Sequence, residues 1–410
     1  MKFIYTVALL CYFSFASAQR CVTDDHINLQ SILRTGNIDP QNTRGQKDIL
    51  ADQVIIIPVV IHVLYNSSEQ NISDQQILSQ ITALNNDYRR RNADMVNTPD
   101  VFKKVAADTR IEFCLAKVDP AGKPTSGIVR KYTKLTQFLA DDAVKFSSKG
   151  GDDAWDATKY LNIWVCNLFG RTLGYAVLPG GPLDRDGVVM KHNVFGTTGN
   201  VYSPYNKGRT ATHEIGHWLG LQHLWGSETC GDDGIDDTPK QQASNSGCST
   251  FPHLSACSEN QFGDMFMNYM DFSNDACMNM FTIGQKNAMR SLFSIGGARN
   301  SFLSSYACNG VNAEEGSLPD NSNHEVVDNS MIKVYPNPFT DKIIISASTE
   351  NDLSGKTFKI YGASGKQFSS KVLQSGTTTI DVSHLPAGIY FAKIEGNGKP
   401  MMIKLVKISR

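Results

Sequence analysis

The sequence predicts an α+β domain followed by a small all-β sandwich. The chain has 410 residues, which is long for a single domain, and its hydrophobic content of 41% is enough to form packed cores. Residues 51–308 contain apolar β-branched runs and one long amphipathic segment, whereas short alternating strands follow Lys333. The first pattern indicates a mixed sheet with helices, and the second indicates a sandwich.

Residues 1–18 are predicted to be a secretory signal peptide. Lys2 supplies a positive charge, Phe3–Phe15 is an apolar run of suitable length, and Ala16–Ala18 forms an A-x-A cleavage site. No other segment is long and apolar enough to span a membrane. We therefore expect an exported protein in which disulfides can form.

Residues 19–50 are predicted to be a polar pro-segment, with a short helix around Asp25 to Arg34 and a processing point near Arg44. Cys21 allows two interpretations. A thiolate is a soft zinc ligand, so this residue could occupy an open metal position and hold an enzyme latent. Alternatively, it is an incidental or disulfide-bonded cysteine near a new N-terminus.

The segment 51–308 contains the elements expected for the α+β domain. Val54–Tyr65 is a buried β-branched run, and His62 within it is interpreted as a core residue. Ser73 is typical of the N-cap of an amphipathic helix that extends to about Arg91. The other expected elements are strands at Ile111–Val118, Leu161–Leu168, Leu173–Leu178 and Gly187–Asn193, and a closing helix at Gly284–Phe293.

One stretch of this segment, 213–223, reads H-E-x-x-H-x-x-G-x-x-H. His213 and His217 are one helical turn apart and can reach a single metal ion. Glu214 lies about 100° around the helix from His213, close enough to act on a water at that metal. This spacing therefore predicts an active-site helix.

The end of the motif predicts a third metal ligand. Gly220 can adopt a positive φ at little steric cost, so the helix can stop and the chain can turn. After that turn His223 can deliver a third nitrogen, which leaves the fourth zinc position open, as in catalytic sites. Thr210 and Thr212 are candidate N-caps of the helix.

The cysteines divide into two groups. Cys114 and Cys166 fall in expected strands and are interpreted as buried thiols rather than a cross-strand bridge, while Cys308 is not assigned. Four more, in the loop-rich stretch after the zinc motif, would form two bridges in one of three pairings. They are Cys230, Cys248, Cys257 and Cys277.

An acidic stretch, Cys230–Thr238, places four carboxylates among glycines. Carboxylate and carbonyl oxygens at this spacing suit Ca²⁺, although the stretch does not match an EF-hand loop. The alternative is a solvated acidic turn.

Residues 309–332 have the composition of a linker, rich in Asn, Glu, Asp, Ser and Gly. The segment 333–410 then predicts a small β-sandwich without catalytic-looking residues. Its expected strands are Lys342–Ser348, Thr357–Tyr361, Thr378–Val382, Gly388–Ile394 and Met401–Ile408.

The zinc motif, followed by Asn268–Phe272 with Met270 at its centre, resembles the metzincin metalloproteases, in which a Met-turn lies beneath the metal. The stretches 223–225, 232–239 and 268–281 narrow the resemblance to the secreted bacterial and archaeal branch of the pappalysin family, over about residues 50–300. This resemblance implies a zinc endopeptidase made as a zymogen, in agreement with a Cys21 switch. The match at Cys21 is loose, because Val22 follows it where a Gly is expected.

The same resemblance implies further sites. Two disulfides, Cys230–Cys257 and Cys248–Cys277, are implied, together with structural Ca²⁺ near Asp232, Ile235 and Asp237. Asp275 stands where relatives that cut before Arg have an acidic S1′ residue, since a carboxylate selects a guanidinium through paired hydrogen bonds; the alternative is a turn-capping Asp. Phe272 departs from the family, because several metzincins have a Tyr there that holds the tetrahedral intermediate.

The C-terminal segment resembles the sorting domain of type IX secretion in Bacteroidetes, on the basis of Val334–Phe339 (V-Y-P-N-P-F) and a sandwich containing Gly388–Tyr390. The resemblance implies a partnership with that secretion machinery and a final location outside the cell or on its surface. The alternative is a glycan-binding or adhesive module.

The predicted activity is hydrolysis of peptide bonds in proteins, N-terminal to Arg and more weakly to Lys, with Glu214 taking the proton from the attacking water. The net charge of −1 gives no electrostatic argument for a nucleic-acid partner. The rival hypothesis is a non-catalytic surface or adhesion protein with structural zinc. An intact Glu214 argues against it, because a structural site needs no base.

Overall fold

The computed structural model describes Cys21, Thr23 and residues 53–258, 261–305, 307–308, 332–335, 339–347, 353–362, 367–374, 377–386, 388–395 and 401–407. The chain divides into two compact units, Met1–Glu314 and Glu315–Arg410. The predicted signal peptide, the helix around 25–34, the processing point near Arg44 and the linker up to residue 331 lie outside the described residues.

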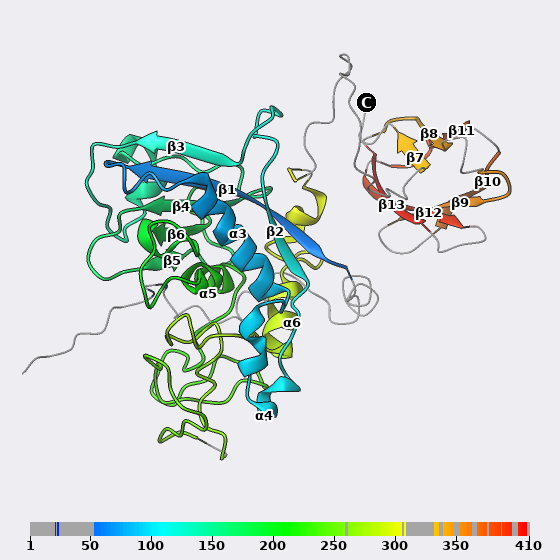
Figure 1. Ribbon diagram of the computed structural model, residues 1–410. Coiled ribbons are helices and arrows are strands. Elements are labelled where there is room, and N and C mark those ends of the chain that lie inside the picture. The colour runs from blue at the N-terminus through cyan, green and yellow to red at the C-terminus, as the bar shows by residue number, and fades with distance from the viewer. Residues whose placement is uncertain are drawn as a thin grey trace, which may run out of the picture. The chain divides into compact units, whose positions relative to one another are not determined.

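A six-stranded mixed sheet forms the framework of the first unit (Figure 1). The strand order is β2-β1-β4-β6-β5, and β3 also pairs with β1. The eleven-residue strand β1 pairs with β2 along its first half and with β3 along its second half. All pairs are parallel except β5 with β6. The bounds are β1 Ile55–Tyr65, β2 Ile111–Leu115, β3 Ile128–Tyr132, β4 Leu161–Cys166, β5 Gly174–Ala176 and β6 Val188–Lys191.

The mixed sheet and its helices confirm the predicted α+β class. The sequence prediction missed β3, because none of its five side chains is buried and it lacks an apolar run. His62 is a core residue as predicted: it is fully buried, and its ring nitrogens contact Asp152 Oδ2 at 2.7 Å and Asn162 Oδ1 at 3.1 Å.

Helix α3 (Asp74–Tyr88) packs against β2 and against the active-site helix α5 (Arg209–Trp218). The Ser73 side chain accepts from the Gln76 amide, so the predicted N-cap is confirmed. A complete capping box begins the closing helix α6 (Ile283–Ser291). The short elements are α4 Asp100–Lys103, η1 Ala93–Asn97, η2 Ala143–Lys145, η3 Ser147–Lys149, η4 Leu183–Arg185, η5 His192–Val194 and η6 Asn300–Ser304.

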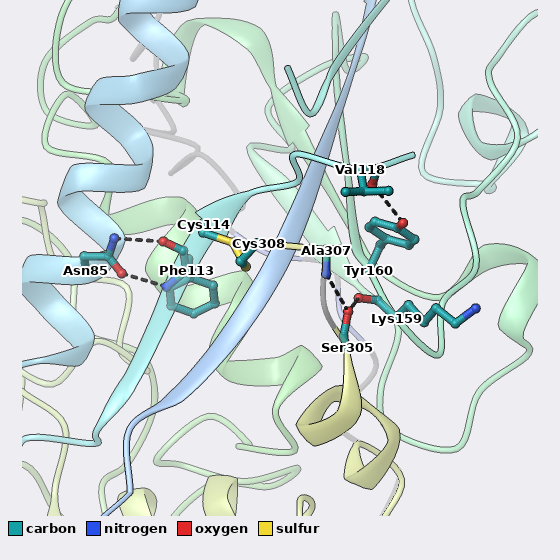
Figure 2. The surroundings of a disulfide bond; sticks show 9 residues. All are labelled: Asn85, Phe113, Cys114, Val118, Lys159, Tyr160, Ser305, Ala307 and Cys308. Atoms are coloured by element: carbon teal, nitrogen blue, oxygen red, sulfur yellow. Dashed lines mark hydrogen bonds between the residues drawn. A yellow bond between two sulfur atoms is a disulfide. The ribbon is translucent and has the colours of Figure 1, made fainter. Parts of the chain in front are cut away.

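The structure corrects the interpretation of Cys114 as a buried thiol, since this residue forms a disulfide with Cys308. The end of the first unit is brought to β2 by backbone contacts that local patterns cannot reveal: the Lys117 amide donates to the Ala307 carbonyl at 2.7 Å. In Figure 2 the Ser305 hydroxyl, which donates to the Lys159 carbonyl at 3.1 Å, holds the same segment. Cys166 is a buried free thiol.

The loop-rich stretch after α5 contains two further disulfides, Cys230–Cys257 and Cys248–Cys277, with the pairing that the family resemblance implied. The two bridges interleave along the chain. They therefore constrain a segment in which the described residues form no strand and, before α6, no α-helix.

The second unit is a sandwich of two antiparallel sheets, as predicted, with orders β10-β9-β12-β13 and β11-β8-β7. Both sheets contribute to one apolar core, for example Ile343 and Ile345 from one and Phe358 and Ile360 from the other. The bounds are β7 Ile332–Tyr335, β8 Lys342–Ala347, β9 Thr357–Gly362, β10 Gln367–Val372, β11 Thr377–Asp381, β12 Gly388–Glu395 and β13 Met401–Lys407.

Among the residues that the structure describes, no helix has the length and apolar character needed to cross a membrane.

Candidate active site

The active-site helix α5 begins at Arg209, after Gly208 with φ 76°. The prediction that Thr210 or Thr212 caps it is wrong, because both lie inside the helix. The Asp275 carboxylate, from a distant loop, instead accepts the backbone N–H groups of Lys207 at 2.9 Å and Arg209 at 3.2 Å. A remote carboxylate thus satisfies amides at the start of the helix that a local cap would otherwise take.

The three histidines of the motif converge as predicted. Gly220 has φ 85°, which ends the helix and returns His223 to the face that presents His213 and His217. Their Nε2 atoms form a nearly equilateral triangle, with sides of 3.1, 3.1 and 3.2 Å. All three residues are buried.

The hydrogen bonds of two histidines fix their tautomers. His213 Nδ1 lies 2.8 Å from the Tyr269 carbonyl and His217 Nδ1 lies 2.8 Å from the Leu221 carbonyl, and a carbonyl can only accept. Each Nδ1 therefore carries the proton, and the bare Nε2 lone pairs face one another. A tetrahedral zinc ion, with bonds of about 2.0–2.1 Å, requires ligand nitrogens about 3.4 Å apart, so the triangle fits such an ion.

Glu214 is fully buried beside the three histidines. Its Oε2 accepts from the Thr23 hydroxyl at 3.2 Å and from the Cys21 thiol at 3.3 Å. The ligand atoms of Cys21 and of the three histidines all lie within 4.8 Å of one another. Cys21 and Thr23 therefore enter the site itself.

Strand β5 pairs with these two residues. Cys21 forms a parallel bridge with Gly174, and the Ala176 amide donates to the Thr23 hydroxyl at 3.0 Å. Gly174 also lies close to the catalytic-motif glutamate. A Cβ atom at this position would lie 2.8 Å from Glu214 Cγ, so only glycine lets β5 pass this close to the Glu214 side chain. Sequence analysis missed Thr23 and Gly174, because an isolated Thr or Gly carries no motif.

Met270 packs against the active-site helix, and two aromatic rings pack on His223. The Met270 sulfur lies against Gly216, where an added Cβ would approach it to 2.4 Å. Phe272 packs on His223 with ring centroids 4.9 Å apart, and Trp225 stacks on the same imidazole at 4.5 Å. Phe272 therefore provides apolar packing at the position where several metzincins have a hydroxyl.

The acidic residues singled out in the sequence occupy two places. Asp275 is fully buried at the amino end of α5. In the acidic stretch Asp232 is exposed, while Ile235 is buried and its carbonyl accepts from the Thr238 hydroxyl at 2.7 Å. Asp237 Oδ2 accepts from the Gly284 amide at 2.8 Å, and its other oxygen is buried without a hydrogen bond.

Comparisons with known proteins agree with this geometry. Residues 146–294 match the peptidase family described as Pregnancy-associated plasma protein-A. An extracellular metalloprotease of Podospora anserina is 35% identical over 284 residues, which cover 67% of this chain and 84% of that protein. An extracellular metalloprotease of Arthroderma gypseum is 29% identical over 72% of this chain and 90% of its own length.

Two solved structures are more similar in sequence to this chain than these two extracellular metalloproteases are. Mature mirolysin of Tannerella forsythia, in complex with a cleaved peptide, is 51% identical over its whole length and 64% of this chain, with a TM-score of 0.62. The chain belongs to the pappalysin family. A promirolysin mutant of the same organism is 46% identical over its whole length and 72% of this chain, with a TM-score of 0.64.

This pappalysin is therefore a metalloendopeptidase with protein substrates and a metzincin fold. Its residues 333–408 match a secretion system C-terminal sorting domain, which agrees with the sandwich of the second unit. The sorting domain and the extracellular relatives indicate a secreted or cell-surface protein.

Proposed function

We propose that this pappalysin is a zinc endopeptidase in which His213, His217 and His223 hold the metal and Glu214 is the general base. The observation that carries the proposal is the convergence of three histidine Nε2 atoms beside a buried carboxylate. Bound zinc would polarise the scissile carbonyl and acidify water. Glu214 takes the proton from the attacking water and passes it to the leaving amine.

We propose that the enzyme cleaves N-terminal to Arg, and to Lys more weakly, through Asp275. Two observations support this: the carboxylate is buried, and it lies at the start of α5, one turn before His213. A guanidinium could pair with such a carboxylate through two parallel hydrogen bonds from separate nitrogens, whereas an ammonium offers donors on a single nitrogen. Because Asp275 Oδ2 also accepts two backbone amides, the test variant is Asp275→Asn, which keeps an acceptor oxygen.

We propose that Cys21 holds the zymogen latent. Its sulfur lies at the histidine cluster and in contact with Glu214, and Thr23 occupies the same carboxylate while it accepts from the β5 amide of Ala176. A thiolate at the fourth metal position and a hydroxyl on the base would together exclude water and substrate. Full-length Cys21→Ala should then cleave a peptide without the lag of the wild-type chain, and an equal lag in both would contradict the switch.

We propose a structural Ca²⁺ near Asp232, Asp237 and the Ile235 carbonyl. The support is the buried Asp237 Oδ1, which has no hydrogen-bond partner, since a buried carboxylate oxygen of this kind is costly without a cation or a donor. Asp233 Oδ2, in the same stretch, is likewise buried without a partner.

We propose that export uses type IX secretion, with 1–18 as the signal peptide, 19–50 as the pro-segment, 51–308 as the catalytic domain, 309–332 as the linker and 333–410 as the sorting domain. The match of residues 333–408 to a sorting domain supports the last boundary. Deleting 333–410 should retain the protein inside the cell envelope, and undiminished release would contradict this role.

The decisive experiment for activity is digestion of a mixed peptide library by the processed protein, with and without a zinc chelator, with the cut sites read by mass spectrometry. Wild type should cut before Arg, and the chelator should abolish the cuts. Glu214→Gln should bind zinc but lose nearly all turnover, and Asp275→Asn should cut without the Arg preference. Cleavage by Glu214→Gln at the wild-type rate would refute the assigned base, whereas a wild type that makes no chelator-sensitive cuts would favour the non-catalytic alternative.

A further inference from the structure

A buried cluster of polar residues lies beneath the active-site helix, outside the groups assigned above. It centres on Asp87, at the end of α3, whose side chain is 1% exposed. Asp87 Oδ1 accepts from the Tyr269 hydroxyl at 3.0 Å, and Asp87 Oδ2 accepts from the Thr212 hydroxyl at 2.8 Å. Arg209 faces the same carboxylate, with its Nε 3.0 Å from Oδ2.

Both hydroxyl partners of Asp87 connect directly to the first metal-binding histidine. Tyr269 supplies the carbonyl that accepts from His213 Nδ1 at 2.8 Å, and thereby sets the tautomer and the direction of that ring. Thr212 is the residue before His213 on the helix. Through its two oxygens the Asp87 carboxylate thus holds both Thr212, which precedes His213 on the helix, and Tyr269, whose carbonyl orients the His213 ring.

Arg209 extends the cluster to the segment after the Met-turn. Its Nη1 donates to the carbonyls of Asp275 and Met278, at 2.8 and 2.9 Å, and to Asp94 Oδ2 at 2.9 Å. Burial raises the pKa of Asp87, while the Arg209 charge and the three side-chain donors act in the opposite direction. The guanidinium is what allows this buried carboxylate to remain beneath the helix.

We propose that Asp87 is a positioning residue of the metal centre, which acts on His213 through Tyr269 and Thr212. The inference rests on the proposed function, because it requires that His213 binds the metal. Asp87 does not touch substrate or metal. Its effect is to fix the ring angle of one ligand, which sets how well the three nitrogens match the ion.

The test measures metal affinity rather than turnover. Variants are made in the full-length chain carrying Glu214→Gln, so that no protein digests itself, and the zinc dissociation constant is measured by competition with a chromophoric chelator. Tyr269→Phe and Thr212→Val each remove one hydroxyl and keep the shape of the side chain, while Asp87→Asn alters both links. Each should weaken zinc binding by about tenfold, the lower end of the range for groups behind a metal ligand.

Two comparisons separate positioning from stability. Asp94→Asn is the matched control, since the Asp94 carboxylate also pairs with Arg209 but accepts its hydrogen bonds from Arg209 and Asn92. It should lower the melting temperature of the zinc-free protein but keep zinc affinity within about twofold of the parent. The double variant Asp87→Asn/Tyr269→Phe should bind zinc no more weakly than Asp87→Asn alone, because Asp87→Asn already alters the link to Tyr269.

The outcomes distinguish a positioning role of Asp87 from a purely structural one. If the Asp87, Tyr269 and Thr212 variants only lower the melting temperature of the zinc-free protein, Asp87 is structural and the inference is overturned. If the parent chain binds no zinc, or His213→Ala leaves binding unchanged, the proposed metal site itself fails. Cobalt(II)-loaded protein gives an independent readout, because a reoriented His213 ring shifts the visible absorption of the metal.

Discussion

Gly216→Ala should weaken the catalytic unit, although the same change in an exposed helix would strengthen it. Alanine favours the helix by about 1 kcal/mol over glycine. At Gly216, however, the new methyl group would lie 2.4 Å from the Met270 sulfur and 3.3 Å from its Cε, and Met270 is fully buried. Ordinary contact requires about 3.5–4.0 Å, so the sulfur must move by more than about 1 Å.

The expected magnitude follows from these opposing effects. Overpacking of a dense core costs about 1–3 kcal/mol, and the gain in helix propensity offsets about 1 kcal/mol of it. The net loss of about 1 kcal/mol should lower the melting temperature by about 2–4 °C for a unit of this size. Differential scanning calorimetry of the full-length Glu214→Gln chain resolves such a shift.

A double-mutant cycle identifies the contact responsible. Met270→Ala alone should cost about 2–5 kcal/mol through the cavity it leaves against Gly216. In the double variant Gly216→Ala/Met270→Ala the added methyl group has room, so the combined loss should be smaller than the sum by about 1–2 kcal/mol. If Gly216→Ala instead stabilises the protein by the full propensity gain, Met270 does not press on this helix and the Met-turn reasoning is refuted.

Three further predictions follow from individual side chains. Burial raises the pKa of Asp271 to about 6 from its ordinary 3.8. The contribution of Asp271 to stability is therefore present below pH 3.8 and is lost as the pH rises through 6. Over this range the unfolding free energy of Asp271→Asn should fall less than that of the wild type. Added Ca²⁺ should raise the melting temperature of wild type but not of Asp237→Asn, and equal shifts would exclude the proposed calcium site. Phe272→Tyr should raise kcat, by up to about 100-fold if its hydroxyl meets the developing oxyanion, whereas an unchanged kcat would limit the position to packing.

The zinc motif was predictable because its geometry is local. The spacing of His213, His217 and Gly220 on one helix and its terminal turn determines where three nitrogens can meet, whatever the remaining fold. The apolar run of β1 and the Ser73 cap were readable for the same reason. Such features depend on residues within one or two turns of each other.

The predictions that failed depend on residues far apart in the sequence. Thr210 and Thr212 satisfy the local rule for a cap, yet the Asp275 carboxylate takes that role from more than sixty positions away. Cys114 pairs with Cys308 across a sequence separation of 194, which no periodicity reveals. Tertiary contacts decide which of several locally allowed partners a side chain finds, and a single sequence does not contain that choice in readable form.

The Cys114–Cys308 bond determines what a proteolytic cut in the first unit would do. It joins the edge strand β2 to the last described residue of the first unit, so the active-site helix, Met270 and both other disulfides lie inside one covalent loop. A single cut anywhere between these cysteines opens the loop without releasing either piece. The fragments remain tethered at millimolar effective concentration and can stay folded together. A nicked enzyme would therefore separate into two bands on a gel only after reduction.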